Sequence, residues 1–205
     1  MEKIKDKSFL LVPIIVGVVS LVFLVSSVSA ITPPKDTKSG STLKQRVDQR
    51  KKERGIKLDD IERTRIVGVC QISQTKIRDL RDSYVPTADR RSKAYNQIDA
   101  KLWVIIGGLK YIEFDTFGLE RQRVQLLGKI NNYERLYDQF NESLDDAVNM
   151  NCKADPPGFK ALVETARIYN VQIRDQLNDI TTFTNDQIRK TLNDITETLR
   201  VRASE

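Results

Sequence analysis

The stretch "SYVPTAD" (residues 83–89) decides the fold, because its proline either ends a helix or lies inside one. Apolar residues recur at spacings of three and four from Ile66 to Tyr84, and the same spacing continues from Tyr95 to Ile112. Such spacing is typical of the buried seam of a coiled-coil-like helix. A reversal at Pro86 gives four helices joined by short turns, whereas continuation gives three.

Two arguments about Pro86 oppose each other. Proline in a helix interior costs ~3 kcal/mol and disfavours helix at the residue before it. However, seven residues separate Tyr84 from Arg91 and seven more reach Ile98, so the same helical face is kept across the proline. We therefore prefer one long helix over about 58–113, kinked at Pro86.

Two further seams follow. One runs from Leu126 to Ala147 and predicts a helix over 119–148. The other runs from Leu162 to Leu199 and predicts a helix over 158–202, with stutters, which unwind a supercoil locally, after Tyr169 and again after Ile180. No alternating pattern of useful length predicts a strand. The sequence therefore predicts an all-α protein, with residues 58–205 forming an elongated antiparallel three-helix bundle with coiled-coil-like packing.

The two cysteines distinguish the two topologies. Cys152 lies in "NMNCKADPPGFK" (149–160), where the second helix ends. In the four-helix version it is roughly 21 Å from Cys70 along the helix, at ~1.5 Å per residue, and a disulfide needs Cα atoms ~4.4 to 6.8 Å apart. In the three-helix version Ala147 lies beside Thr87, and five extended residues bring Cys152 to within roughly 9 Å of the level of Cys70. Continuation through Pro86 thus predicts a Cys70–Cys152 bond; the alternative is two free thiols.

Residues 1–30 have the pattern of an export segment. Lys3, Lys5 and Lys7 precede an apolar run from Phe9 to Val25, and "SSVSA" ends in small residues suited to cleavage. The run is longer than the ~7 to 15 residues of a usual signal core and approaches the ~20 that span a bilayer, so cleavage and retention as an N-terminal transmembrane anchor both stay open. Either fate predicts an extracytoplasmic protein, secreted, periplasmic or on the cell surface, where disulfides form.

Residues 31–57 are predicted to be a linker and a basic tether. Residues 35–57 contain nine basic against three acidic side chains, whereas 58–205 contain 22 against 23. We expect a solvated helix beginning near Leu43, capped by Ser41 or Thr42 and weakened by Gly55. Its position favours an anionic membrane surface or wall polymer over nucleic acid as ligand. The candidate polyanion-binding residues are Lys44, Arg46, Arg50, Lys51, Lys52, Arg54 and Lys57.

The segment "KLWVIIGGLKYIEF" (101–114) is apolar on every helical face from Leu102 to Ile106. It is either a fully buried stretch of helix, with the glycines permitting close approach, or a contact patch for a partner chain or membrane surface. The candidate contact residues of the second interpretation are Trp103, Val104 and Ile106.

No residue pattern predicts catalysis. The chain has no histidine, which excludes Ser/His or Cys/His relays and histidine-containing metal sites. The adjacent carboxylates of Asp145 and Asp146 point about 100° apart on a helix, so solvated surface is the expected role. We predict no catalytic residue, metal, cofactor or small-molecule substrate. The arrangement resembles exported helical proteins of bacteria, a resemblance that transfers no functional residue.

The predicted function is that of a non-enzymatic scaffold or protein-interaction module at the cell envelope. Its partner is another protein or a second copy, bound through exposed helical faces. The alternative is a module that binds anionic polymers or lipid headgroups through residues 44–57.

Overall fold

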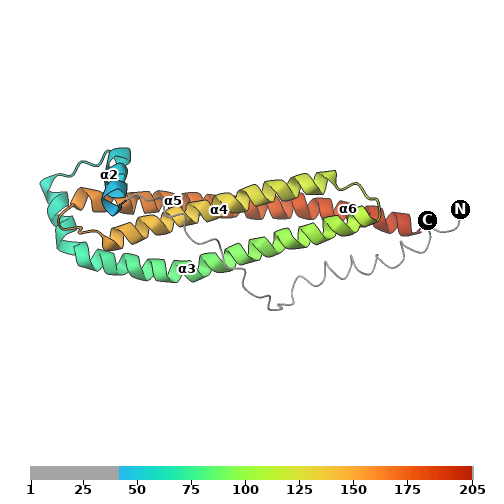
Figure 1. The fold of residues 1–205 in the computed structure, drawn as a ribbon, viewed down its shortest axis with the longest axis horizontal. Coiled ribbons are helices and arrows are strands. Elements are labelled where there is room, and N and C mark those ends of the chain that lie inside the picture. The colour runs from blue at the N-terminus through green and yellow to red at the C-terminus, as the bar shows by residue number, and fades with distance from the viewer. Residues whose placement is uncertain (1–41, 205) are drawn as a thin grey trace. The chain divides into compact units, whose positions relative to one another are not determined.

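The computed structural model describes residues 42–204, and this part of the chain is all-helical, as predicted. Four helices pack together: α2 (Leu43–Arg54), α3 (Asp60–Tyr111), α4 (Phe117–Asn149) and α5 (Pro156–Thr182) (Figure 1). A π-helical turn, η2 (Phe183–Ile188), follows α5 and leads into α6 (Arg189–Ser204). The predicted export segment lies outside the described residues.

The helices contribute to two compact units. The described part of the first, called here the disulfide unit, consists of 42–97 and Gly128–Ile180. The described part of the second unit, called here the turn unit, consists of Ile98–Leu127 and 181–204. Each unit has its own buried side chains and is described by itself below.

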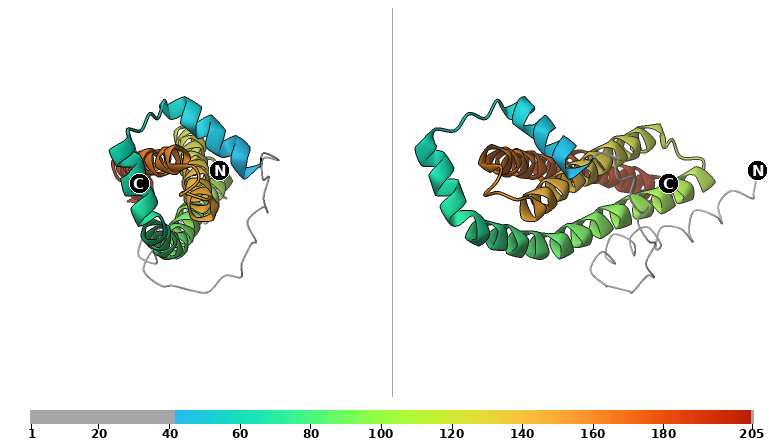
Figure 2. Two further views of the ribbon diagram at one scale, coloured as in Figure 1. Left: turned by 90° about the vertical axis from the view of Figure 1, so that its left-hand side faces the viewer. Right: turned by 60° about the vertical axis from the view of Figure 1, so that its left-hand side comes forward.

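Helix α3 continues through Pro86, and the chain does not reverse at "SYVPTAD" (Figure 2). Pro86 is exposed, and so is Asp82, whose carbonyl loses its helical N–H partner because proline has none. Water can reach that carbonyl, which lowers the cost of the missing hydrogen bond. The opposite face of the helix keeps the seam, with Ala88 buried and Tyr84 half-buried.

The helix ends lie within two residues of the predicted ones, and the third predicted helix corresponds to the unbroken helical run of α5, η2 and α6. Helix α5 begins at Pro156 because Asp155 Oδ1 accepts a hydrogen bond from the Gly158 N–H at 3.0 Å, and proline is favoured in a first helical turn. The predicted stutter after Ile180 coincides with η2, whose extra residue per turn keeps Phe183 and Ile188 buried.

In the disulfide unit, α3 and α4 run antiparallel around an aromatic core. The ring centroids of Tyr84 and Phe140 lie 5.3 Å apart, and those of Tyr95 and Tyr133 lie 5.7 Å apart in an edge-on arrangement. Burial raises the pKa of Tyr133 to about 12, because its phenolate would lose contact with water.

The predicted register between α3 and α4 was wrong. Gln74 Nε2 donates to the carbonyl of Ala147 at 3.0 Å, so Ala147 lies beside Gln74 rather than beside Thr87. Part of the shift arises because α3 already ends at Tyr111, and the connection to α4 takes only residues 112–116. The shift brings the end of α4 closer to the level of Cys70.

The turn unit has a smaller core around that connection. Leu102, Ile106 and Leu109 form a buried stripe on α3, and Leu119 and Leu126 are buried on α4. The turn itself places Glu113 in the left-handed backbone region, with φ 55°. Asp115 Oδ1 then accepts from the Phe117 N–H at 3.0 Å and starts α4.

Candidate interaction surfaces

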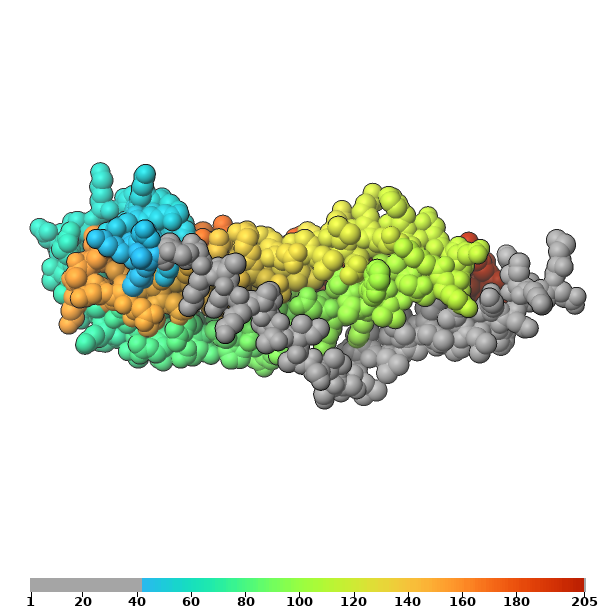
Figure 3. Space-filling model, viewed as in Figure 1, coloured from blue at the N-terminus to red at the C-terminus, as the bar shows by residue number. Residues whose placement is uncertain are grey.

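Within the disulfide unit, the basic helix α2 packs against the residues around the disulfide and the start of α5. The prediction of a solvated helix was therefore wrong. Val47 is 5% exposed and packs in a cluster with Cys70 and Phe159. A Cβ added to Gly158 would lie 2.5 Å from Val47 Cγ1, so the glycine at the start of α5 permits this approach. Figure 3 shows α2 in blue against the orange end of α4 and start of α5.

The ends of α2 are well defined. Thr42 and Gln45 form a reciprocal capping box at its N-terminus. Of the two predicted N-cap residues, Ser41 and Thr42, it is therefore Thr42 that caps the helix. Gly55 adopts φ 59° and donates its N–H to the carbonyls of Lys51 and Lys52. Gly55 therefore terminates the helix, which needs a left-handed residue there, rather than weakening its interior.

Cys70 and Cys152 form a disulfide, with Cα atoms 5.9 Å apart. Both residues are buried, at 4% and 0% exposure, in the same cluster as Val47. The bond joins α3 to the connection between α4 and α5, beside α2. This pairing agrees with the prediction that linked the bond to a helix continuing through Pro86.

The strongest polar contact of α2 is made by Arg46. Its Nε donates to Asp146 Oδ2 at 2.7 Å and its Nη2 to Asp146 Oδ1 at 2.6 Å, a bidentate pair. The hydrogen bonds to this carboxylate raise the pKa of Arg46. Asp146 is only 5% exposed, so its predicted role as solvated surface was wrong. Sequence spacing gave no signal for this contact, because the two residues are 100 positions apart.

Two more basic residues of α2 face the protein. The guanidinium of Arg50 lies 5.7 Å from the centroid of the Tyr169 ring, a cation–π contact. Lys51 Nζ lies 3.0 Å from Oδ2 of Asp155, and Asp155 is the residue that caps α5. Hydrogen bonds to carboxylates raise the pKa of Lys51. These contacts hold α2 in place in addition to Val47.

The remaining polyanion candidates divide into two groups. Arg54 Nε donates to Thr165 Oγ1 at 3.3 Å and also faces the protein. Lys44, Lys52 and Lys57 are exposed. The structure therefore leaves three of the seven predicted basic residues directed to solvent.

The three residues of the predicted contact patch, Trp103, Val104 and Ile106, lie on different faces of α3. Trp103 is 61% exposed and Val104 is 67% exposed, whereas Ile106 is 2% exposed and belongs to the core of the turn unit. The assignment of Ile106 to a contact surface was therefore wrong. Ile106 continues the stripe begun by Leu102, four residues earlier, whereas Trp103 and Val104 lie off that stripe.

Three exposed apolar side chains near this patch were missed. Tyr111 is 69% exposed, Phe117 is 71% exposed and Val124 is 66% exposed. Phe117 and Val124 are seven residues apart, so they share one face of α4. This seven-residue spacing, out of phase with the buried seam, was the sequence pattern that could have indicated an exposed apolar face on α4. We call Trp103, Val104, Tyr111, Phe117 and Val124 together the exposed apolar set.

Trp103 is held by its neighbours within the turn unit. The guanidinium of Arg123 lies 5.0 Å from the centroid of its ring. Arg123 Nη2 also donates to Asp99 Oδ2 at 2.9 Å, which fixes the guanidinium against α3. The indole is therefore positioned at the surface by an ion pair between α3 and α4.

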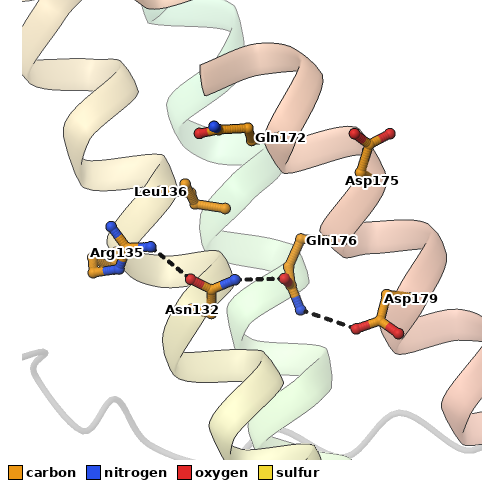
Figure 4. A pocket seen from close by; sticks show the side chains of 7 residues that line it. All are labelled: Asn132, Arg135, Leu136, Gln172, Asp175, Gln176 and Asp179. Atoms are coloured by element: carbon orange, nitrogen blue, oxygen red, sulfur yellow. Dashed lines mark hydrogen bonds between the residues drawn. The ribbon is translucent and has the colours of Figure 1, made fainter. Parts of the chain in front are cut away.

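A polar hollow in the disulfide unit lies between α4 and α5 (Figure 4). Asn132 Nδ2 donates to Gln176 Oε1 at 2.5 Å, and Arg135 Nη2 donates to Asn132 Oδ1 at 2.7 Å. Lys129 Nζ, nearby, donates to Asp179 Oδ2 at 2.5 Å. These groups satisfy one another, so the hollow offers a ligand little beyond exchange of existing hydrogen bonds.

Comparison of the chain with protein-family models, with curated proteins and with solved structures finds no match. Within residues 42–204, no group of three or more His, Cys, Asp or Glu side chains is placed to hold a metal ion. Across the same residues, no helix is both long and apolar enough to cross a bilayer.

Proposed function

We propose that the protein is a non-enzymatic extracytoplasmic scaffold, secreted or held by an N-terminal anchor, that binds another protein through the turn unit. The exposed apolar set carries this proposal. Seven large apolar side chains in the described chain are more than 60% exposed, and five of them belong to that set, on two helices joined by a five-residue turn. Single exposed apolar residues are ordinary, but a local group of them indicates an interaction surface.

The compartment and the finer architecture belong to the same proposal. The buried Cys70–Cys152 bond supports an oxidising compartment, since disulfides persist there. We propose that α3, α4 and the run of α5 and α6 form the elongated antiparallel three-helix bundle predicted from the seams, with α2 docked on it. Small-angle scattering should then give a maximum dimension at least near the ~78 Å length of a 52-residue helix.

Site-specific photo-cross-linking in native membranes tests the partner surface. A photoreactive residue at Val104 or Val124 in the full chain should give a defined adduct on illumination. The matched control is Ile61, which is 78% exposed but lies in the disulfide unit. Adducts from Ile61 with none from Val104 or Val124 would remove the turn unit as the partner surface.

The second candidate function is binding of an anionic polymer or lipid headgroup through α2 and Lys57. Exposed Lys44, Lys52 and Lys57 support it. Deleting 35–57 is a poor test because it also removes Val47 and Arg46, which contribute to the fold. Changing the three lysines to Glu leaves those contacts in place. Binding to anionic vesicles should then be lost, and wild-type binding should weaken with salt.

The same triple variant separates the two functions. A protein scaffold keeps its Val104 cross-links when the three lysines are reversed, whereas a polyanion-binding module loses its ligand. Wild-type affinity for anionic vesicles that is unchanged by salt would contradict an electrostatic site.

A further inference from the structure

The outward face of α3 in the turn unit has an apolar residue on each side of two glycines. Val104, Gly107, Gly108 and Tyr111 are all exposed. Val104 and Tyr111 are seven residues apart and point in nearly the same direction, with the glycines on either side of the line between them. The face is therefore a shallow gap between two apolar side chains.

Among residues 42–204, no contact requires the glycines. A Cβ added to Gly107 or Gly108 would have nothing within 4 Å. Glycine destabilises a helix interior relative to alanine, so the residue type is unfavourable for α3 itself. What the glycines do provide is close access to the helix backbone from outside the chain.

The charges on this face identify the occupant. Lys101 is exposed at the end of the face nearer the start of α3, and Glu113 and Asp115 are exposed in the turn that follows Tyr111 at the other end. A second copy running antiparallel places Lys101 against the partner's Glu113 and the partner's Asp115. A copy running parallel would place like charges together, which is unfavourable.

We propose that two copies of the chain associate through this face, as an antiparallel pair of α3 helices centred on Gly107 and Gly108. The contact is isologous, so Val104 packs against the partner's Tyr111 and each ion pair occurs twice. The proposal rests on the proposed function, and it names a second copy of the chain as the protein bound by the turn unit.

Cysteine cross-linking of the full chain tests the geometry. With Val104→Cys and Tyr111→Cys in the same chain, mild oxidation should give a covalent dimer, because residue 104 lies level with residue 111 of the partner. Val104→Cys alone should give none, since its two copies would lie about 10 Å apart along the helix. Efficient dimerisation of the single variant would overturn the antiparallel pairing.

Three further variants test the contact without disturbing the fold. Gly108→Leu should abolish the cross-link of the double-cysteine chain without lowering its thermal unfolding midpoint, because an added Cβ has nothing within 4 Å there and leucine favours helix over glycine. Lys101→Glu should weaken association at least roughly tenfold, since symmetry replaces attraction by repulsion at both ends of the contact. Glu113→Lys and Asp115→Lys, added to Lys101→Glu, should restore it. A dimer that tolerates Gly108→Leu would contradict the proposal.

The outcomes also separate this proposal from the proposed function. If the double-cysteine chain stays monomeric while a photoreactive residue at Val104 captures a different protein, self-association is wrong and the scaffold function stands. If neither experiment gives an adduct, both are wrong.

Discussion

The disulfide unit and the turn unit place their apolar side chains differently. In the disulfide unit, Val47 from α2 covers Cys70 and Cys152, so even a helix poor in apolar residues contributes to the core. In the turn unit, Trp103 and Val104 remain more than 60% exposed beside a buried stripe. The difference indicates that the disulfide unit is stabilised by contacts within the chain, whereas the surface of the turn unit is not needed for folding.

Gly158 of the disulfide unit differs in the same way from the glycines of the turn unit, although Gly55, Gly68 and Gly128 of the disulfide unit also have nothing within 4 Å of an added Cβ. Gly158 is closely approached by Val47 and has no room for a side chain, whereas Gly107 and Gly108 face open space. Substitution of Gly158 should therefore lower the free energy of unfolding, and substitution of Gly107 or Gly108 should not.

The largest effect is expected from removing the disulfide. Changing Cys70 and Cys152 together to Ala should lower the free energy of unfolding by about 4 kcal/mol in the chain-entropy model, because the bond closes a loop of about 80 residues. Urea denaturation followed by circular dichroism measures the change. Reduction of the wild type should lower its midpoint similarly, and an unchanged midpoint in both cases would show that contacts other than the bond hold this end of the unit.

The next effect concerns the ion pair that docks α2. Arg46→Ala should lower the free energy of unfolding by about 2 to 3 kcal/mol, because it leaves the buried carboxylate of Asp146 without its bidentate partner. Urea denaturation gives the value, with Lys52→Ala, an exposed lysine of the same helix, as the matched control. Equal effects of the two substitutions would mean that α2 does not contribute to the unit through this pair.

The aromatic core predicts a loss of stability at high pH. The phenol of Tyr133 ionises near 10 in the unfolded chain and at about 12 in the folded one. Below pH 10 the phenol is mainly protonated in both states, so the free energy of unfolding changes little with pH. As the pH rises from 10 to 12 only the unfolded chain loses the proton, so folding is disfavoured by roughly 2 kcal/mol. Unfolding curves at pH 9 and 11.5 measure the loss, and Tyr133→Phe should reduce it; an equal loss in that variant would assign it to other groups.

The course of α3 was predictable because its signals are local or geometric. Heptad spacing on both sides of Pro86 outweighed the cost of the proline. Helix rise then brought Cys152 to within roughly 9 Å of the level of Cys70, and the observed shift of register accounts for part of the remaining gap. The predicted stutter after Ile180 coincides with η2, although its spacing alone did not predict a π-helical turn. Each of these inferences uses residues close in sequence or a fixed length per residue.

The docking of α2 was not predictable in that way. It depends on Val47 fitting against Gly158 and on Arg46 meeting Asp146, and both pairs are about 100 residues apart. A low apolar content does not reveal such pairs. The error at Ile106 has a related cause, since a segment that is apolar on every face does not indicate which face is buried.

The smallest effects come from the glycines and compare the two units directly. Gly107→Ala should raise the free energy of unfolding by about 1 kcal/mol, because alanine favours helix and its Cβ meets nothing within 4 Å. Gly158→Ala should lower it by about 1 to 2 kcal/mol, because the Cβ would press against Val47 and force α2 outward. Urea denaturation of both variants under identical conditions gives the two signs. If Gly107→Ala destabilises the chain at a concentration where it is monomeric, that face of α3 is covered within the folded monomer, and the contrast between the units does not hold.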